Sequence, residues 1–462
     1  ACSTTPRPLV PDTTQGPARI NLESTLRGGE LLLGPVYATL PNHAVQLSMD
    51  AQADAGALTI GRLRVGDPDA LSLNGAMAFD AKGDLRSLNL SRLDLDLPAA
   101  YERYGKAWLA TMGLHDMATR GDVEATIDLR ADGLHAFDFD TDGLDVADGD
   151  GRFAVQGLKG GLDWSRQGSR QSTSLGWRSL SVYKLVNGAA RSKWQSEDGV
   201  LALKQPVAMG LLGGQVRLSQ LAWSPAAAKG QRLDASLALA GVDMTAFSRA
   251  MGWPAFPGTL GGAITGLTVS GDRIALDGGL SVNVFGGFVD VTGLSLQQPF
   301  GDNPVLAGDI ALRQLDLGAI TSVFDFGSIT GPLDGQVSGL RLVNWQPVAF
   351  DAQLLAAQGG RISQRAVNNL TSVGGGGVAA GLQGAVLKLF KSFGYKRIEL
   401  NCRLQGSLCH MSGLEPTPDG YTIVEGSGLP HLEVIGHESD VDWPTLVRRL
   451  KAAVAGGGPE VR

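Results

Sequence analysis

The sequence predicts a mainly β protein, built as an elongated, strongly twisted antiparallel β-sheet with short helices between its repeats and helices at its C-terminus. Three observations predict this fold class. Glycine supplies 64 of the 462 residues, about twice its usual share of ~7%, which is typical of many short strands joined by glycine turns. Apolar and polar residues alternate with a period of two over long stretches. A unit of 73 residues recurs along the chain.

The alternation predicts strands from Ile20 to about Trp223. Residues 93–97 read Leu-Asp-Leu-Asp-Leu, and residues 137–140 read Phe-Asp-Phe-Asp. Successive side chains of a strand point to opposite faces of the sheet, so this pattern gives one apolar face and one wet face.

The internal repeat is marked by glycine pairs that begin at Gly213, Gly286 and Gly359, each 73 residues after the last. In this frame Asp243 matches Asp316, and each aspartate opens a predicted short helix whose first free N–H groups its side chain can cap. A degenerate third copy is expected at Asp96, with a longer helix over residues 98–114. The other identities of the repeat pair Ala246 with Ala319, Gly258 with Gly331, Leu260 with Leu333, Gly262 with Gly335, Gly266 with Gly339, and Leu267 with Leu340.

These patterns divide the chain into five parts. Residues 1–19 read as a polar tether, residues 20–200 as an N-terminal β-repeat region and residues 201–360 as the region of 73-residue units. Residues 361–455 form a C-terminal capping region of helices and strands, and residues 456–462 a disordered tail. In the capping region the pattern predicts a helical face from Leu370 to Phe393, a hairpin over 398–411, strands over 421–424 and 432–435, and a final helix from Asp442.

The three cysteines predict a compartment. Ala1-Cys2 followed by Ser-Thr-Thr-Pro resembles the cleavage site of a bacterial lipoprotein, so Cys2 is the expected lipidation site, with an ordinary cysteine in a frayed terminus as the alternative. A two-residue turn at Gln405-Gly406 would place Cys402 opposite Cys409, close enough for a disulfide. A disulfide needs an oxidising compartment; the alternative is a pair of small buried thiols.

The composition and motifs exclude several classes. The net charge of −7 argues against a nucleic-acid partner, which would need clustered Lys and Arg. No run of about 18 apolar residues occurs that could span a membrane as a helix. The chain has no serine-hydrolase, phosphate-loop or zinc-protease motif, and no marked pair of converging carboxylates. We therefore expect no enzyme activity and no cofactor.

Two groups of residues could suggest a metal but fit poorly. Asp138, Asp140, Asp142 and Gly143 match the start of a calcium loop, yet Gly149 stands where a bidentate glutamate is required. His410, His431 and His437 follow no zinc-ligand spacing. The interpretation favoured for both groups is ordinary polar surface, with no metal site.

The 73-residue units and the C-terminal region together resemble the AsmA-like superfamily of bacterial envelope proteins, and within it the YdbH-like branch, whose members are labelled "dicarboxylate transport". The resemblance is carried by LALAGVDMTAFSRAMG, IALRQLDLGAITSVF, the GxLxG-xxxGL run after each helix, and the ending FGYKRIELNCRLQGSLCHMSGL…VDWPTLVRRL. The resemblance is good over residues 200–455. Over the first 200 residues it is limited to the general pattern of the sequence. It implies a β-taco-like sheet folded into an open apolar groove that carries phospholipids between membranes.

This chain departs from that family in being short for a full bridge and in beginning like a lipoprotein. We expect a periplasmic protein anchored to the outer membrane. Its expected partners are a phospholipid or another acyl-chain lipid, and other envelope proteins. Low aromatic content, 6%, favours a lipid over a sugar. The alternative is a structural or adhesion β-solenoid with a filled interior. The candidate groove-lining residues are Leu233, Leu237, Leu239, Leu280, Val282, Val284, Val289 and Val291.

Overall fold

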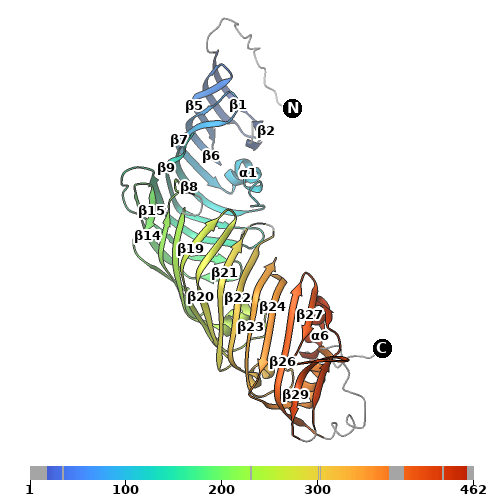
Figure 1. Ribbon diagram of the computed structural model, residues 1–462. Helices are drawn as coiled ribbons and strands as arrows, with labels where there is room; N and C mark the ends of the chain where they lie inside the picture. The colour runs from blue at the N-terminus through green and yellow to red at the C-terminus, as the bar shows by residue number, and fades with distance from the viewer. Residues whose placement is uncertain are drawn as a thin grey trace. The chain divides into compact units, whose positions relative to one another are not determined.

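The computed structural model describes residues 18–33, 36–228, 232–299, 301, 303–373, 390–428 and 431–454. The chain divides into two compact units: unit 1 holds Ala1–Leu211 and Val216–Leu237, and unit 2 holds Leu212–Gln215 and Ala238–Arg462. Cys2, most of the predicted tether and the predicted tail lie outside the described residues. Each unit is mainly β with antiparallel pairing, as the sequence predicted (Figure 1).

The first part of unit 1 is a regular antiparallel sheet in which each strand pairs with the next. Its strands are β1 (Ala18–Leu26), β4 (Val45–Asp54), β5 (Ala57–Asp67), β6 (Leu71–Phe79), β7 (Leu85–Leu97), β8 (Ala118–Arg130), β9 (Gly133–Ala147) and β10 (Phe153–Ser165). Strands β2 (Gly29–Leu33) and β3 (Val36–Leu40) form a separate hairpin.

The second part of unit 1 consists of shorter strands. They are β11 (Thr173–Trp177), β12 (Ser179–Val182), β13 (Leu185–Asn187), β14 (Ala190–Glu197), β15 (Val200–Leu203), β16 (Val207–Leu211) and β17 (Gly214–Trp223). Strand β10 pairs with both β11 and β12, so the ladder branches there into two rows of short strands.

The helix expected over residues 98–114 is shorter than predicted and irregular. A π-helical turn, η1 (Tyr101–Gly105), runs into α1 (Lys106–Ala110). Its anchor is the buried carboxylate of Asp67, which accepts hydrogen bonds from Arg103 at 2.6 Å and Tyr104 at 2.8 Å, and lies 2.6 Å from the ring of His43. Side-chain bonds to one buried acid therefore help to hold this segment on the sheet, together with the apolar packing of Ala100 and Tyr104.

Unit 2 repeats one strand–helix–strand pattern at the predicted spacing. Strand β18 (Leu233–Asp243), which belongs to unit 2 from Ala238 onward, leads into α2 (Met244–Met251), and β22 (Val305–Asp316) leads into α3 (Leu317–Val323). Between and after them lie β19 (Gly258–Ser270), β20 (Arg273–Val284), β21 (Gly287–Gln297), β23 (Pro332–Val343) and β24 (Gln346–Ala356). Gly213, Gly286 and Gly359 all have positive φ, of 81°, 72° and 71°, which explains why glycine recurs there.

A large hydrophobic core lies at the C-terminal end of unit 2. Helices α4 (Gln364–Val373) and α6 (Trp443–Val454) contribute to one buried cluster with the last strands. Those strands are β25 (Gly360–Ser363), β26 (Ser392–Gln405), β27 (Leu408–Ser412), β28 (Pro416–Thr417), β29 (Gly420–Ser427), β30 (Glu433–Gly436) and β31 (Asp440–Asp442). The prediction of one helical face as far as Phe393 is wrong at its end, because Phe393 lies buried in strand β26; residues 374–389 lie outside the described part.

A disulfide joins Cys402 to Cys409, with their Cα atoms 5.7 Å apart. The register predicted for this hairpin is wrong, because the turn lies one residue later than predicted and each residue therefore pairs two positions further along the opposite strand. Gln405 pairs with Leu408, Leu404 with Cys409, and Cys402 with Met411. The turn is Gly406-Ser407, since Gly406 takes the positive φ that a two-residue hairpin turn with glycine in first place requires. The two cysteines are therefore diagonal neighbours on one face.

Candidate functional site

The aliphatic candidates of unit 2 lie in two rows that cross the sheet. In an antiparallel ladder, residues directly opposite each other project from the same face. Val282 is opposite Leu260 on one side and Val289 on the other. The same row continues through Leu312, Gly335, Leu354 and Leu400. The next row contains Leu280, Val291, Ile310, Val337, Ala352 and Cys402.

We call the face that carries these two rows the aliphatic face. A glycine, Gly335, interrupts the first row between two leucines. A Cβ added to Gly335 would lie 2.6 Å from the Gln353 carbonyl oxygen, 2.9 Å from Leu354 Cδ2 and 3.1 Å from Leu312 Cδ1. The two leucine side chains thus approach the space that a side chain at position 335 would occupy.

The opposite face of the same strands is polar and internally paired. Ser281 donates to Asp290 at 2.6 Å, and Arg313 lies 3.2 Å from the same carboxylate. Further along, Gln336 donates to Gln353, and Arg403 pairs with Asp351. Asn283, the neighbour of Val282, belongs to this polar face, where Thr259 and Phe288 are its partners.

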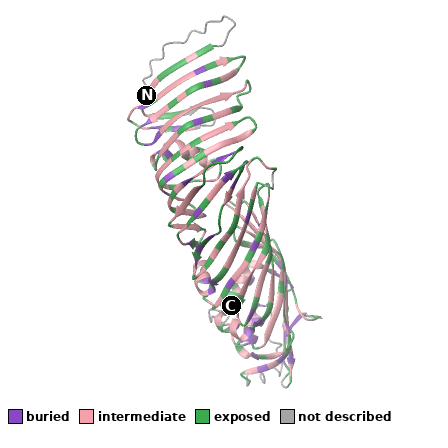
Figure 2. Cartoon of the chain, turned by 90° about the vertical axis from the view of Figure 1, so that its left-hand side faces the viewer, coloured by how far each residue is buried: buried purple, intermediate pink, exposed green. Residues whose placement is uncertain are grey.

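The middle of the aliphatic face is only partly covered. Leu280, Val282, Val289, Val291, Ile310, Leu312, Val337 and Leu354 are all intermediate between buried and exposed. Figure 2 shows intermediate and exposed residues alternating along the strands. A sheet face packed under a second layer would have its mid-strand aliphatic residues buried, and these residues are not.

Full burial occurs at the edge of the face that the short helices line. Val284 is 4% exposed, and a Cβ on Gly258 would sit between Val284 and Met244 of α2. In the next repeat Leu315 and Leu317 are buried in the same way as Val242 and Met244. Of the predicted lining residues, Val284 therefore belongs to a helix-covered edge and not to the partly exposed part of the face.

The aliphatic face ends in the C-terminal core. On β26, Cys402 and Leu404 lie on this face and are buried in the cluster that α4 and α6 complete. The partly exposed part of the face therefore extends from β20 to β24, and the part beyond is closed.

The three candidates on β18 share one face of that strand, because they are separated by even numbers of residues. Leu233, Leu237 and Leu239 are all of intermediate exposure, and Ala235 between them is buried. Leu233 and Leu237 belong to unit 1 and Leu239 to unit 2. They resemble the residues of the aliphatic face in type and exposure.

Unit 1 carries a comparable apolar row that was not singled out from the sequence. The register aligns the residues on one face from β1 to β10. The row contains Leu22, Met49, Leu63, Gly75, Leu90, Ile127, Phe137 and Trp164. The period-two alternation in the sequence shows which residues of each strand share a face. It does not show which residue of one strand lies opposite which residue of the next, so the row could not be traced from the sequence.

This row ends in aromatic side chains. Trp164 is fully buried, and its indole N–H donates to the Gly199 carbonyl at 3.0 Å. Its ring stacks on Phe137 with centroids 6.0 Å apart, and Trp223 contacts both rings. Within unit 1 the row thus passes from aliphatic residues to a filled aromatic cluster.

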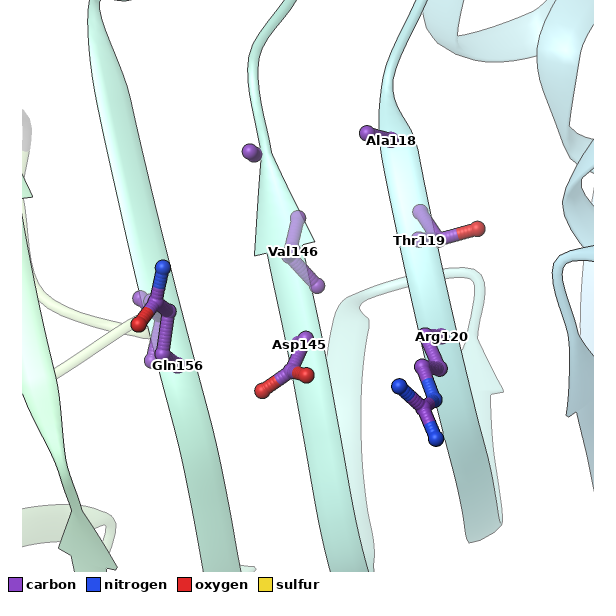
Figure 3. A pocket seen from close by; sticks show the side chains of 8 residues that line it. Ala118, Thr119, Arg120, Asp145, Val146 and Gln156 are labelled. Atoms are coloured by element: carbon purple, nitrogen blue, oxygen red, sulfur yellow. The ribbon is translucent and has the colours of Figure 1, made fainter.

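Two shallow depressions lie on the sheet surfaces. In unit 1 a space of about 180 Å³ is bounded by β8, β9 and β10, where Arg120 is the cross-strand partner of Asp145 and Gln156 lies beside them (Figure 3). In unit 2 a space of about 320 Å³ on the polar face adjoins Phe288, a residue that is 49% exposed. Neither brings together a nucleophile, a base and an oxyanion donor.

The residues considered for metals are dispersed. Asp138 and Asp140 project from the polar side of β9, and burial together with the nearby charges of Asp163 and Asp140 raises the pKa of Asp138. His410 pairs with Asp440, and His437 bonds to the backbone at Asp419. Over the described ranges, no group of three His, Cys, Asp or Glu side chains is placed to hold a metal ion.

Two further findings bear on function. None of the described helices is both long enough and apolar enough to cross a membrane. Comparison of the chain with protein-family models and with curated proteins gives no match.

Proposed function

We propose that this protein binds acyl-chain lipids on its aliphatic face and takes part in moving phospholipids between the membranes of a bacterial envelope. The ligand is a phospholipid or another lipid with extended hydrocarbon tails. The tails lie along the rows of Leu, Ile and Val, and the head group stays in water.

The observation that carries the proposal is the partial exposure of two complete aliphatic rows in β20–β24. Contiguous apolar surface exposed on a soluble protein commonly marks a binding site. Each methylene transferred from water onto such a surface contributes about 0.8 kcal/mol, so one acyl chain can be held without any polar contact. The segregation of all charged partners to the other face leaves nothing along the rows that would oppose a hydrocarbon tail.

The compartment is part of the same proposal. A disulfide between Cys402 and Cys409 supports an oxidising environment such as the periplasm. The resemblance of residues 200–455 to AsmA-like envelope proteins supports the same location. Attachment to the outer membrane through Cys2 completes the proposal.

Native mass spectrometry tests the proposal. The protein, purified from an envelope fraction in mild detergent, should carry adducts with the masses of phospholipids. Val282→Asp should remove the adducts, because an unpaired charge on an apolar surface costs several kcal/mol. The matched control Asn283→Asp changes the polar face and should keep them. Unfolding of Val282→Asp, with adduct-free wild type, would favour the filled β-solenoid instead.

A further inference from the structure

Within the described residues, strand β1 is an edge strand of the sheet in unit 1. It forms nine consecutive pairs with β4, from Ala18 opposite Ala53 to Leu26 opposite Val45, without a bulge. Among the described strands, β4 is its only partner. Proteins usually protect such an edge with a proline, a bulge or charged side chains. Strand β1 has no proline and no bulge, and its two charges, Arg19 and Glu23, are of opposite sign.

The two faces of β1 continue the faces of the sheet. Ile20 and Leu22 extend the apolar side, opposite Ala51 and Met49. Leu22 is 38% exposed at this edge. Arg19, Asn21 and Glu23 extend the polar side and are exposed. The edge thus offers backbone hydrogen bonds, an apolar row and two opposite charges within five residues.

We propose that a second copy of this chain pairs with β1 across this edge, antiparallel, with Asn21 opposite Asn21 of the other copy. In that register Arg19 lies opposite Glu23 and Ile20 opposite Leu22, and the two-fold symmetry makes each pair twice. Both faces are then matched, since oppositely charged and apolar cross-strand pairs each stabilise a ladder.

Neighbouring registers are less favourable. A shift by one residue of one strand would align the apolar face of one copy with the polar face of the other. A register with Glu23 opposite itself places like charges together. One with Leu22 opposite itself pairs Ile20 with Ser24 and leaves both charges without a charged partner. In a register with Ile20 opposite itself, Ala18 is the last residue that can pair, opposite Leu22. Glu23 then has no partner within β1 of the other copy. The charge pattern therefore selects the Asn21 register.

The pairing joins the apolar rows of two copies into one. Because a single strand pair buries far less than the ~1,600 Å² of a standard interface, we expect a weak, concentration-dependent dimer. Covalent trapping is therefore the appropriate measurement. This proposal does not depend on lipid binding, and the two can be tested separately.

Cysteine scanning tests the register in the full-length protein with Cys2→Ser as background. Single cysteines at positions 20, 21, 22 and 23 are oxidised and resolved on non-reducing gels. Asn21→Cys should give the highest yield of disulfide-linked dimer, since only position 21 faces itself at a Cα distance of about 4.5–5.5 Å. A maximum at position 22 or 23, or equal low yields at all four, would overturn the proposal.

Charge exchange provides the control. Adding Glu23→Arg to Asn21→Cys places two arginines opposite each other and should lower the dimer yield roughly tenfold. Adding Arg19→Glu as well restores the opposite pairing and should restore the yield. The β4 partners of these positions, Gln52 and Ser48, are uncharged, so the fold of unit 1 is not expected to change. If Glu23→Arg combined with Arg19→Glu does not restore the yield of disulfide-linked dimer, the proposed register is contradicted.

Discussion

Asp243 and Asp316 stand at the same position of successive repeats, and each caps the helix that follows it, although the N–H that donates to the cap is three residues after Asp243 and two residues after Asp316. Each side chain caps its helix, accepting from the N–H of Ala246 or Gly318 at 2.7 Å. Each backbone N–H donates to the residue that precedes the repeated glycine, Leu212 at 3.0 Å or Phe285 at 2.7 Å. The 73-residue period therefore repeats a hydrogen-bonding arrangement as well as amino-acid identities.

This equivalence makes a prediction about the caps. Asp243→Ala and Asp316→Ala should each destabilise the following helix by about 1 kcal/mol, which speeds local amide exchange roughly fivefold. Hydrogen exchange of α2 and α3 measures this. Asparagine caps as well as aspartate, so Asp→Asn variants should exchange like the wild type. An effect confined to one helix would contradict the equivalence.

Reduction of the Cys402–Cys409 disulfide should weaken the C-terminal core. For a sequence separation of seven residues, the loop-entropy relation gives a loss of about 2.5 kcal/mol. Urea unfolding with and without reductant measures it, and the same difference in Cys2→Ser would show that Cys2 is not involved. Mass mapping of non-reduced peptides should find the two cysteines joined; two alkylatable thiols in protein from an oxidising compartment would count against the bond.

Acid should weaken unit 1 through Asp67. Burial alone would raise the pKa of this carboxyl, but hydrogen bonds from His43, Arg103 and Tyr104 outweigh burial and lower the pKa below its ordinary value. The carboxylate therefore stabilises the fold above its unfolded pKa of ~3.9, and this contribution is lost as the pH falls through the lower folded pKa.

Asp67→Asn tests this role. It should cost on the order of 2 kcal/mol at neutral pH, because it leaves the Arg103 guanidinium without its charged partner. The loss should shrink when unfolding is measured below pH 4. Asp69→Asn removes an exposed carboxylate near the same histidine and should have little effect at either pH. An equal loss at both pH values for Asp67→Asn would contradict the electrostatic explanation.

The sequence predicted much of this fold because its signals are local. Period-two alternation located the strands, and aspartates followed by helical spacing located α2 and α3 to within a residue. The final helix begins next to the predicted Asp442. The errors arose where tertiary contacts determine the secondary structure. Arg103 and Tyr104 fix the short helix after Pro98 to Asp67, and Phe393 is buried in the core of the last strands as part of β26.

The candidate site was predicted less completely. Alternation showed which residues of β20 and β21 share a face, but exposure depends on what lies above that face. Val282 and Val284 read alike in the sequence, yet Val284 is buried beside α2 and Val282 is not. The apolar row of unit 1 depends on the register of eight strands, which includes several bulges that alternation alone does not reveal.

The central claim is that lipid tails occupy one face of β20, and the alternation of Val282 and Asn283 allows a direct measurement. A photo-reactive amino acid is placed at position 282 or at position 283, and the protein is irradiated in cells and analysed for crosslinked lipid. The account predicts strong lipid labelling at 282 and little at 283, because the two side chains project from opposite faces of the sheet. Equal labelling at both positions, or none at either in the folded protein, would contradict it.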